Sequence, residues 1–150
     1  MFELIDADLT ERDATLAFVW SRMRVVDEQT DLGRIKVTHL SFEDFLEAIC
    51  RCSVCKAWPT RAEIADAGTG NAGVHMLHLK SEDPDMYDAL LATRSVPFGR
   101  APSMAMATCV EMMCELLIVT CKQRRGGSGL SLALTDKEVA NFLPIHSNDG

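Results

Sequence analysis

An all-α fold is predicted by three observations: repeated signals for helix starts, no clear pair of adjacent strands, and one long apolar run. A helix start is indicated where Ser, Thr or Asp precedes an acidic residue three positions on or a proline one position on, because these residues cap or begin a first turn. Such signals occur at Thr10, Ser41, Thr60, Asp83 and Thr135. The apolar run 101–121 is interrupted by Glu111 and Glu115, which favours a buried core helix over a membrane span.

The first two helices are expected to flank a polar link, 27–39. The first begins at Thr10, continues to about Val26, and carries an apolar stripe at the spacing of one helix face. That stripe consists of Leu16, Val19, Trp20, Met23 and Val26. The second helix begins at Ser41, is stopped by Trp58-Pro59, and is expected to bury Phe45, Leu46 and Ile49.

Five more helices are predicted further along the chain. A short helix capped by Thr60 and Glu63 ends at Ala67-Gly68, and a second one covers 71–79. Asp83-Pro84 begins a helix whose buried side should be Met86, Leu90 and Leu91. The loop 96–102 precedes the long helix 103–123, and the last helix should run from Thr135 to Leu143. Residues 124–129 form a glycine-rich connection, and 35–37 and 130–134 are at most short extended pieces.

Composition and charge are those of a folded acidic protein. The chain has 150 residues, 47% of them hydrophobic and 25% charged, with a formal net charge of −7. This charge argues against partners such as nucleic acid or an anionic membrane and suits a basic protein surface. The first residues, Met1 to Asp6, lack the basic start and apolar run of a signal peptide. A cytoplasmic protein with reduced thiols at its six cysteines is therefore expected.

Residues 40–46 have the order found where a calcium loop of the EF-hand type meets its exit helix. Leu40 stands at the bridge position, Asp44 at the closing acid and Phe45 at the first buried position of the helix. Counted back from Asp44, the loop would open at Gly33, and the next ligand places would hold Ile35 and Val37. These side chains offer no oxygen, whereas calcium needs about six to eight oxygen ligands. The sequence therefore predicts a loop that does not bind calcium.

A second segment, Leu134 to Val139, has a similar but weaker order of residues. Its loop would open at Gly127, with Gly129 at the next ligand place, so it is also poor in oxygen ligands. EF-hands usually pair through their bridge residues, which would place Leu40 opposite Leu134.

Residues 9–23 followed by 40–51 resemble the EF-hand-like helical modules of the calmodulin superfamily, especially divergent modules of flagellar and cytoskeletal proteins. The resemblance covers about residues 9–60. Together with the segment from Leu134 to Val139, it predicts an EF-hand-like helix-loop-helix pair with an inserted helical segment, all in a single domain, 1–150. The first hand would cover about 9–55, the insert about 56–102 and the second hand about 103–144.

The resemblance further implies a non-enzymatic module for protein–protein interaction, without calcium or another cofactor, in a flagellar or cytoskeletal assembly. The partner would be a cytoskeletal protein or an amphipathic helix that lies in an apolar groove between the hands. Residues expected to line this groove are Phe18, Trp20, Met23, Phe45, Ile49, Met112 and Leu116. The eight methionines suit such an adaptable surface, although they suit an ordinary core as well.

Two alternatives remain open. The first is a calcium sensor that uses atypical ligands, since acidic residues crowd the first loop at Asp27, Glu28, Asp31, Glu43 and Asp44. The second is a small zinc-binding protein or enzyme built on the cysteines, with Cys52 and Cys55 as one ligand pair.

Buried free thiols are the favoured interpretation of the cysteines, because a zinc site needs a second pair of ligands. The only spaced histidine pair, His75 and His78, is expected on a solvated helix face. No motif for a nucleophile elbow, a zinc protease or a dinucleotide site is present, so no catalytic residue is predicted.

Overall fold

The computed structural model describes residues 4–22, 30 and 40–124, and in these residues every regular element is an α-helix. The helices are α1 (Glu11–Ser21), α3 (Phe42–Cys55), α4 (Arg61–Asp66), α5 (Ala72–Glu82), α6 (Pro84–Arg94) and α7 (Met106–Arg124). The predicted all-α class is therefore confirmed for the described part of the chain. None of its helices combines the length and the hydropathy needed to cross a bilayer.

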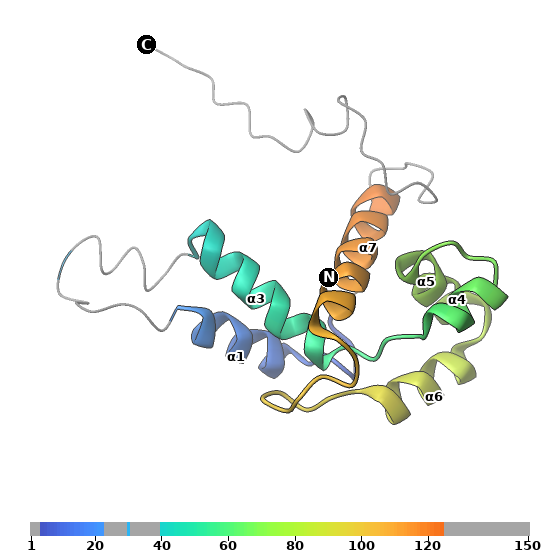
Figure 1. Ribbon diagram of the computed structural model, residues 1–150, viewed down its shortest axis with the longest axis horizontal. Coiled ribbons are helices and arrows are strands. Elements are labelled where there is room, and N and C mark those ends of the chain that lie inside the picture. Colours follow the sequence, from blue (N-terminus) through green and yellow to red (C-terminus); the bar gives the residue numbers. More distant parts are fainter. Residues whose placement is uncertain (1–3, 23–29, 31–39, 125–150) are drawn as a thin grey trace, which may run out of the picture.

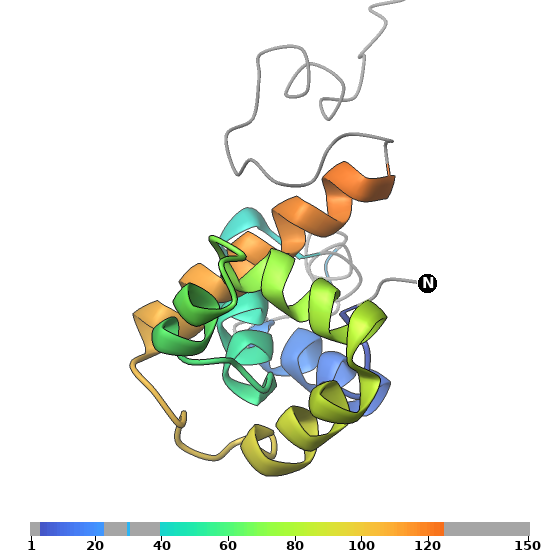
Figure 2. The same cartoon turned by 90° about the vertical axis from the view of Figure 1, so that its right-hand side faces the viewer.

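The helices form two groups joined by α7 (Figure 1). Helices α1 and α3 pack together as a hairpin, and α4, α5 and α6 follow each other around the opposite side. Helix α7 packs against α3 and also against α5, which lies in front of it when the molecule is turned (Figure 2). The largest fully buried side chains include Trp58, Met76, Met112 and Met113, so the core lies where the two groups meet α7.

The helix starts predicted from capping signals within the described residues are confirmed, and their caps explain why. The side chains of Thr10, Ser41 and Thr60 each accept a hydrogen bond from the backbone N–H three residues on, and the backbone N–H of each donates in return to the acidic side chain there. Asn71 caps α5, and Asp83 caps α6 ahead of Pro84. These signals are local in sequence, so they can be recognised without knowledge of the tertiary fold.

Several predicted buried faces are wrong. In α1 the buried residues are Ala17 and Ser21, whereas Val19 and Trp20 are 46% and 48% exposed. In α3, Phe45 and Leu46 are each 47% exposed. In α6, Leu90 and Leu91 are buried as predicted, but Met86 is 56% exposed and Tyr87 is buried instead. In each case the exposed apolar residue belongs to a stripe along one helix face, and the neighbouring helices cover only part of the length of that stripe.

The segment before α1 fastens the hairpin to the rest of the molecule. The Asp8 carboxylate accepts a hydrogen bond from Lys56 Nζ at 2.8 Å and one from the Ala57 N–H at 2.8 Å. The side chains of Asp8 and Lys56 are both fully buried. Asp6 accepts from Lys80 Nζ at 2.8 Å and from the Tyr87 hydroxyl at 3.0 Å. One short segment therefore contacts the end of α3, α5 and α6.

Helices α5 and α7 cross at very close range. A Cβ atom on Gly73 would lie only 2.6 Å from the Glu115 carbonyl oxygen and 2.8 Å from Leu116 Cα. The Glu115 side chain accepts a hydrogen bond from the Ala72 N–H at 2.7 Å, which satisfies one free donor of the first turn of α5. The same carboxylate pairs with Arg61 of α4 at 3.2 Å, so a single acidic side chain holds three helices in register.

Parts of the predicted EF-hand architecture lie outside the described residues. These parts are the first loop, 33–39, the strand-like pieces, and everything predicted after residue 124, including the bridge residue Leu134. The pairing of two hands and the proposed division of the domain therefore stay predictions.

Candidate functional site

Helix α3 carries an apolar stripe, and the rest of the protein buries only part of its length. Phe42, Phe45, Leu46 and Ile49 recur at the spacing of one helix face. Phe42 is 70% exposed and Phe45 is 47% exposed, but Ile49 packs against the core and Ser53 is fully buried. The stripe is therefore buried near the C-terminal end of α3 and open near its N-terminal end.

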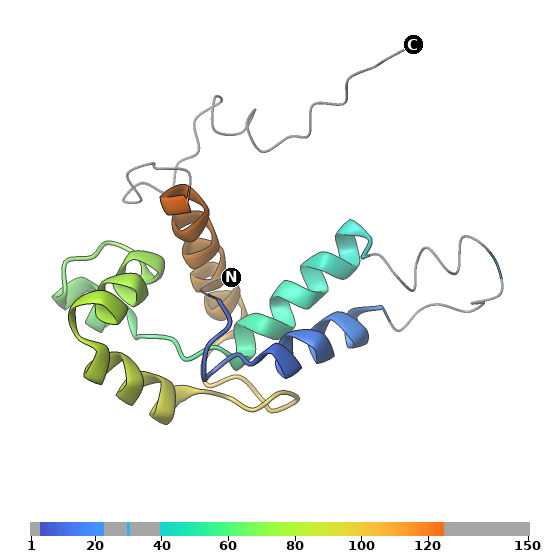
Figure 3. The same cartoon turned by 180° about the vertical axis from the view of Figure 1, so that it is seen from behind.

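Helix α1 adds two exposed apolar side chains at the same end of the hairpin. Because α1 and α3 run in opposite directions, the C-terminal end of α1 lies beside the N-terminal half of α3 (Figure 3). We call the exposed apolar side chains at this end the hairpin patch: Val19, Trp20, Phe42, Phe45 and Leu46. Single exposed apolar residues are ordinary, so it is the grouping of large ones at one end of the hairpin that makes this surface a candidate site.

The structure separates the residues predicted to line a partner groove. Trp20 and Phe45 belong to the hairpin patch, and Phe18 and Ile49 beside it are partly buried. Met112 and Leu116 are 1% and 3% exposed in the core of α7, so they are accessible to a partner only if the core opens. Met23 lies outside the described residues.

The cysteines do not form a metal site in the described part of the chain, where no group of three or more His, Cys, Asp or Glu side chains could hold an ion. Cys52 and Cys55 both belong to α3, which runs through Cys55 without the turn that a zinc knuckle needs. Burial raises the pKa of Cys55 to about 11 and raises the pKa of Cys52 and Cys109 as well. A raised pKa disfavours the thiolate, so these groups suit packing rather than nucleophilic chemistry.

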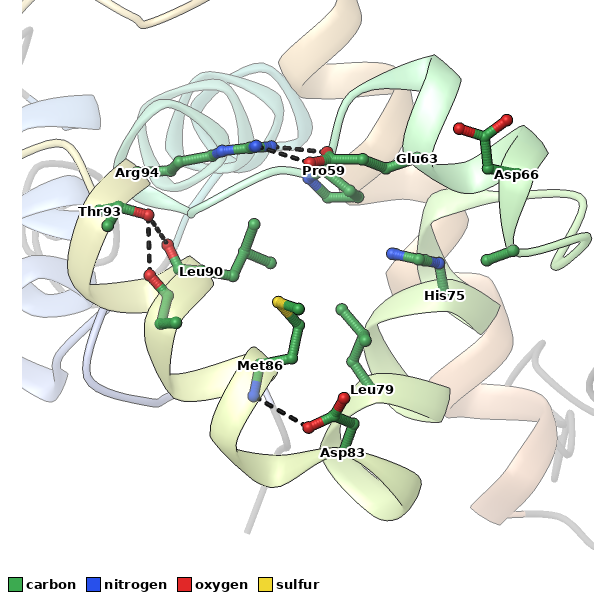
Figure 4. A pocket seen from close by; sticks show the side chains of 12 residues that line it. Pro59, Glu63, Asp66, His75, Leu79, Asp83, Met86, Leu90, Thr93 and Arg94 are labelled. Atoms are coloured by element: carbon green, nitrogen blue, oxygen red, sulfur yellow. Dashed lines mark hydrogen bonds and ion pairs between the residues drawn. The ribbon is translucent and has the colours of Figure 1, made fainter.

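A second candidate site is a cavity of about 460 Å³ between α4, α5 and α6 (Figure 4). Its apolar walls come from Pro59, Ala67, Leu79, Met86, Ala89 and Leu90. Its polar lining consists of Glu63, Asp66, His75, Asp83, Thr93 and Arg94. A mainly apolar cavity with a few convergent polar groups is the usual form of a site for a small ligand.

The strongest ion pair of this cavity joins α4 to α6. Arg94 donates two hydrogen bonds to the two oxygens of Glu63, both at 2.7 Å, and Thr60 N–H donates a third at 2.7 Å. The hydrogen bonds from Arg94 and Thr60 lower the pKa of Glu63 to about 2, so the carboxylate stays charged at neutral pH. Both charged groups are thereby satisfied by each other.

His75 was expected on a solvated helix face, and the structure corrects this prediction. The residue is only 6% exposed, whereas His78 on the next turn is exposed. Burial lowers the pKa of His75, so its ring is neutral at neutral pH. Sequence reasoning missed it because burial of His75 depends on α4 and α6 folding around α5.

A further hollow of about 480 Å³ lies between α3 and the loop before α7. It is lined by Glu47, Cys50, Arg51, Val54, Cys55, Phe98, Gly99, Arg100, Pro102 and Met106. Arg51, which lines this hollow, pairs with Glu47 at 2.6 Å, and its Nε is buried without a hydrogen-bond partner among the described residues.

Comparison of the chain with protein-family models, with curated proteins and with solved structures found no match.

Proposed function

We propose that this protein is a non-enzymatic module for protein–protein interaction, and that the hairpin patch is the surface that binds its partner. The observation that carries the proposal is the apolar stripe of α3, which is buried at one end of the helix and exposed at the other. Covering exposed apolar surface is favourable by roughly 25 cal/mol per Å². A partner that extends the existing cover along α3 would gain this free energy.

The charges beside the patch indicate the chemistry of that partner. Glu43, Asp44 and Glu47 lie on α3 among the exposed aromatic residues, and the chain as a whole carries a net charge of −7. An amphipathic helix with an apolar face and basic flanks would complement both features. The proposed setting is a cytoplasmic assembly of the flagellum or cytoskeleton, which rests on the resemblance of residues 9–60 to EF-hand-like modules.

The first test is affinity capture from extracts of flagellated or ciliated cells with three forms of the full chain. These are the wild type, Phe45→Asp in the hairpin patch, and Met86→Asp as a control at an apolar residue on α6 that is also exposed. We expect one specific partner with a basic amphipathic helix, captured by the wild type and by Met86→Asp but not by Phe45→Asp. Equal capture by both variants would exclude the hairpin patch as the binding surface.

The two tryptophans allow a second test with the purified components. Trp20 is 48% exposed in the patch, whereas Trp58 is 1% exposed and donates its Nε1–H to the Ser53 carbonyl at 2.7 Å. Acrylamide should therefore quench only the Trp20 part of the emission. A synthetic peptide of the partner helix should protect this part, and a peptide that binds without protecting it would place binding elsewhere.

The proposal also includes binding that does not depend on calcium. The residues at the first ligand places, Gly33, Ile35 and Val37, carry no side-chain oxygen. Sensor sites bind calcium at roughly 0.1–10 µM. Calorimetric heat, or partner binding that requires calcium, in this range would instead support the alternative of a sensor with atypical ligands.

A further inference from the structure

We propose that the hollow between α3 and the loop before α7 is a binding site for a small carboxylate with an apolar body, whose carboxylate accepts hydrogen bonds from Arg51 and Arg100. The apolar body of this ligand lies against Val54, Phe98 and Met106, which are part of the lining. The site shares no residue with the hairpin patch and does not depend on the function proposed for that patch.

Arg51 holds a hydrogen-bond donor that the protein leaves unsatisfied. Its Nη2 donates to Glu47 at 2.6 Å, but its Nε is buried and has no hydrogen-bond partner among the described residues. A buried, unpaired N–H of a charged group costs free energy, and an acceptor beside it removes this cost. Because the Arg51 side chain lines the hollow, an oxygen atom of a ligand bound there can supply the acceptor.

Arg100 adds a second guanidinium to the lining, from the loop before α7. It is exposed, and its side chain forms neither a hydrogen bond nor an ion pair with a described residue. Among the described residues that line the hollow, Glu47 is the only carboxylate. The lining therefore has an excess of one positive charge, in a chain whose net charge is −7. This local excess favours an anion, and the planar fork of an Arg side chain matches the geometry of a carboxylate.

The loop wall of the hollow is held in place without a ligand. Val96 N–H donates to the Cys55 carbonyl at 3.1 Å, which ties the start of the loop to the end of α3. Arg100 N–H then donates to the Pro97 carbonyl at 3.1 Å, and Gly99 has the positive φ, 82°, that a type II turn places at its third residue. The wall that carries Arg100 is therefore preorganised, which lowers the cost of ordering it when a ligand binds.

The size and walls of the hollow determine the body of the ligand. A volume of about 480 Å³ lies in the range of roughly 300–1,000 Å³ that is typical of small-molecule sites. Met106 is 47% exposed, and Phe98 is only partly buried against the core, so both side chains keep apolar surface that a ligand can cover. An aromatic or aliphatic group next to a single carboxylate suits these walls.

Three probes test the proposal on the full chain. Hydrocinnamate has a carboxylate and a phenyl group, 3-phenylpropanamide is its neutral analogue, and acetate has the carboxylate without the apolar body. Binding is followed by two-dimensional 1H–15N NMR, which reports the backbone N–H groups and also the Nε–H of arginine side chains. We expect hydrocinnamate to shift the signals of Arg51 Nε, Phe98 and Gly99, and the other two probes to bind several-fold more weakly.

Variants at the arginines locate the charge that binds the carboxylate. Arg51→Met should weaken the binding of hydrocinnamate by about tenfold or more, the loss expected for a hydrogen bond to a charged group. Arg100→Met should weaken it by a smaller factor, because Arg100 is exposed and its charge is screened. The matched control is Arg12→Met, which removes the same charge from exposed surface of α1 outside the lining and should leave the affinity unchanged.

A substitution of Glu47 should change the affinity in the opposite direction. Glu47→Gln removes the carboxylate that occupies Arg51 Nη2, so hydrocinnamate should bind more tightly by up to about fivefold, the factor that corresponds to an exposed ion pair. Glu43→Gln is the control, because it makes the same change in net charge on the same helix but outside the lining. A purely structural role of Arg51 would not produce tighter binding in Glu47→Gln.

Three results would overturn the proposal. One is no shift at Arg51 Nε, Phe98 or Gly99 with hydrocinnamate at millimolar concentration. Another is equal affinity for hydrocinnamate and 3-phenylpropanamide. The third is a set of shifts confined to Leu79 and Leu90, which would place the probe in the cavity between α4, α5 and α6. Because the probe series needs no variant, these results are decisive even if Arg51→Met fails to fold.

Discussion

The two halves of α3 lie in opposite surroundings. In the N-terminal half, Phe42, Phe45 and Leu46 are exposed. In the C-terminal half, Ser53, Val54 and Cys55 are buried, and the buried stretch continues through Pro59. The difference is set by what packs across the helix, since α7 and the segment before α1 reach only the C-terminal end. An apolar stripe therefore predicts which face of a helix packs against the rest of the protein, but not how much of the helix length is buried.

The largest expected effect tests the buried end of this comparison. Asp8→Ala leaves the Lys56 ammonium buried without its partner and removes the acceptor of the Ala57 N–H. Breaking a buried ion pair in this way should cost about 3–5 kcal/mol in the free energy of unfolding, measured with urea.

The matched control is Lys80→Ala, which removes the partially exposed pair between Asp6 and Lys80. Pairs of this kind contribute roughly 0–1 kcal/mol. Similar decreases in the free energy of unfolding for both variants would mean that the Asp8–Lys56 pair is not desolvated. The C-terminal end of α3 would then be less buried than the structure indicates.

A smaller loss is expected for Val54→Ala in the buried half of α3. Val54 is 8% exposed, and removing its two methyl groups gives up about 0.8 kcal/mol for each, plus a contribution from the cavity left behind. We expect a decrease of about 1.5–3 kcal/mol in the free energy of unfolding, obtained from the same urea titration. A decrease below about 0.5 kcal/mol would show that the C-terminal half of α3 is loosely packed.

Phe45→Ala should lower the free energy of unfolding by less than Asp8→Ala or Val54→Ala. A buried Phe at this position, as the EF-hand alignment requires, would lose about 3–5 kcal/mol on truncation. Because Phe45 is 47% exposed, it retains about half of the 1.5–3 kcal/mol gained by full burial, so we expect a loss of about 1 kcal/mol. A loss above about 3 kcal/mol would restore Phe45 as a core anchor and remove it from the hairpin patch.

Thiol labelling sharpens the comparison without changing stability. Cys50 is partly exposed in α3, whereas Cys55 is buried and its pKa is raised to about 11 by burial. A thiol whose pKa is raised carries little reactive thiolate at pH 8, and the fraction increases only as the pH approaches that pKa. Mass spectrometry after iodoacetamide treatment should show modification of the exposed Cys114 first and of Cys50 before Cys55. Early labelling of Cys55 would indicate local opening at the end of α3.

The sequence predicted the elements of the described fold well because helix caps are local. Thr10 with Asp13, Ser41 with Asp44, and Asp83 with Pro84 each lie within four residues of one another, and the structure places a helix start at each. The predicted helix ends were less accurate: α1 ends at Ser21 rather than near Val26, and α7 begins at Met106 rather than near Ser103.

The candidate sites were predicted only in part because burial depends on partners distant in the chain. Trp20 and Phe45 were named as binding residues, but as members of a groove with Met112 and Leu116, which are core residues. The α4–α6 cavity was missed because its lining comes from three helices, and His75 has no local feature that distinguishes it from exposed His78. The Asp8–Lys56 pair spans 48 positions, which no periodic pattern indicates.

The segment before α1 also has a consequence for how the chain is made. Asp6 leaves the ribosome 81 positions ahead of its partner Tyr87, and Asp8 leaves 48 positions ahead of Lys56. At roughly 5–20 residues per second, the first interval lasts about 4–16 s. Until Lys80 is synthesised, 74 positions after Asp6, the nascent segment has neither of its contacts with α5 and α6. A pause in translation between Lys56 and Tyr87 would therefore leave the hairpin with the Asp8–Lys56 contact but without the Asp6–Tyr87 contact. Its apolar surfaces would then be accessible to chaperones.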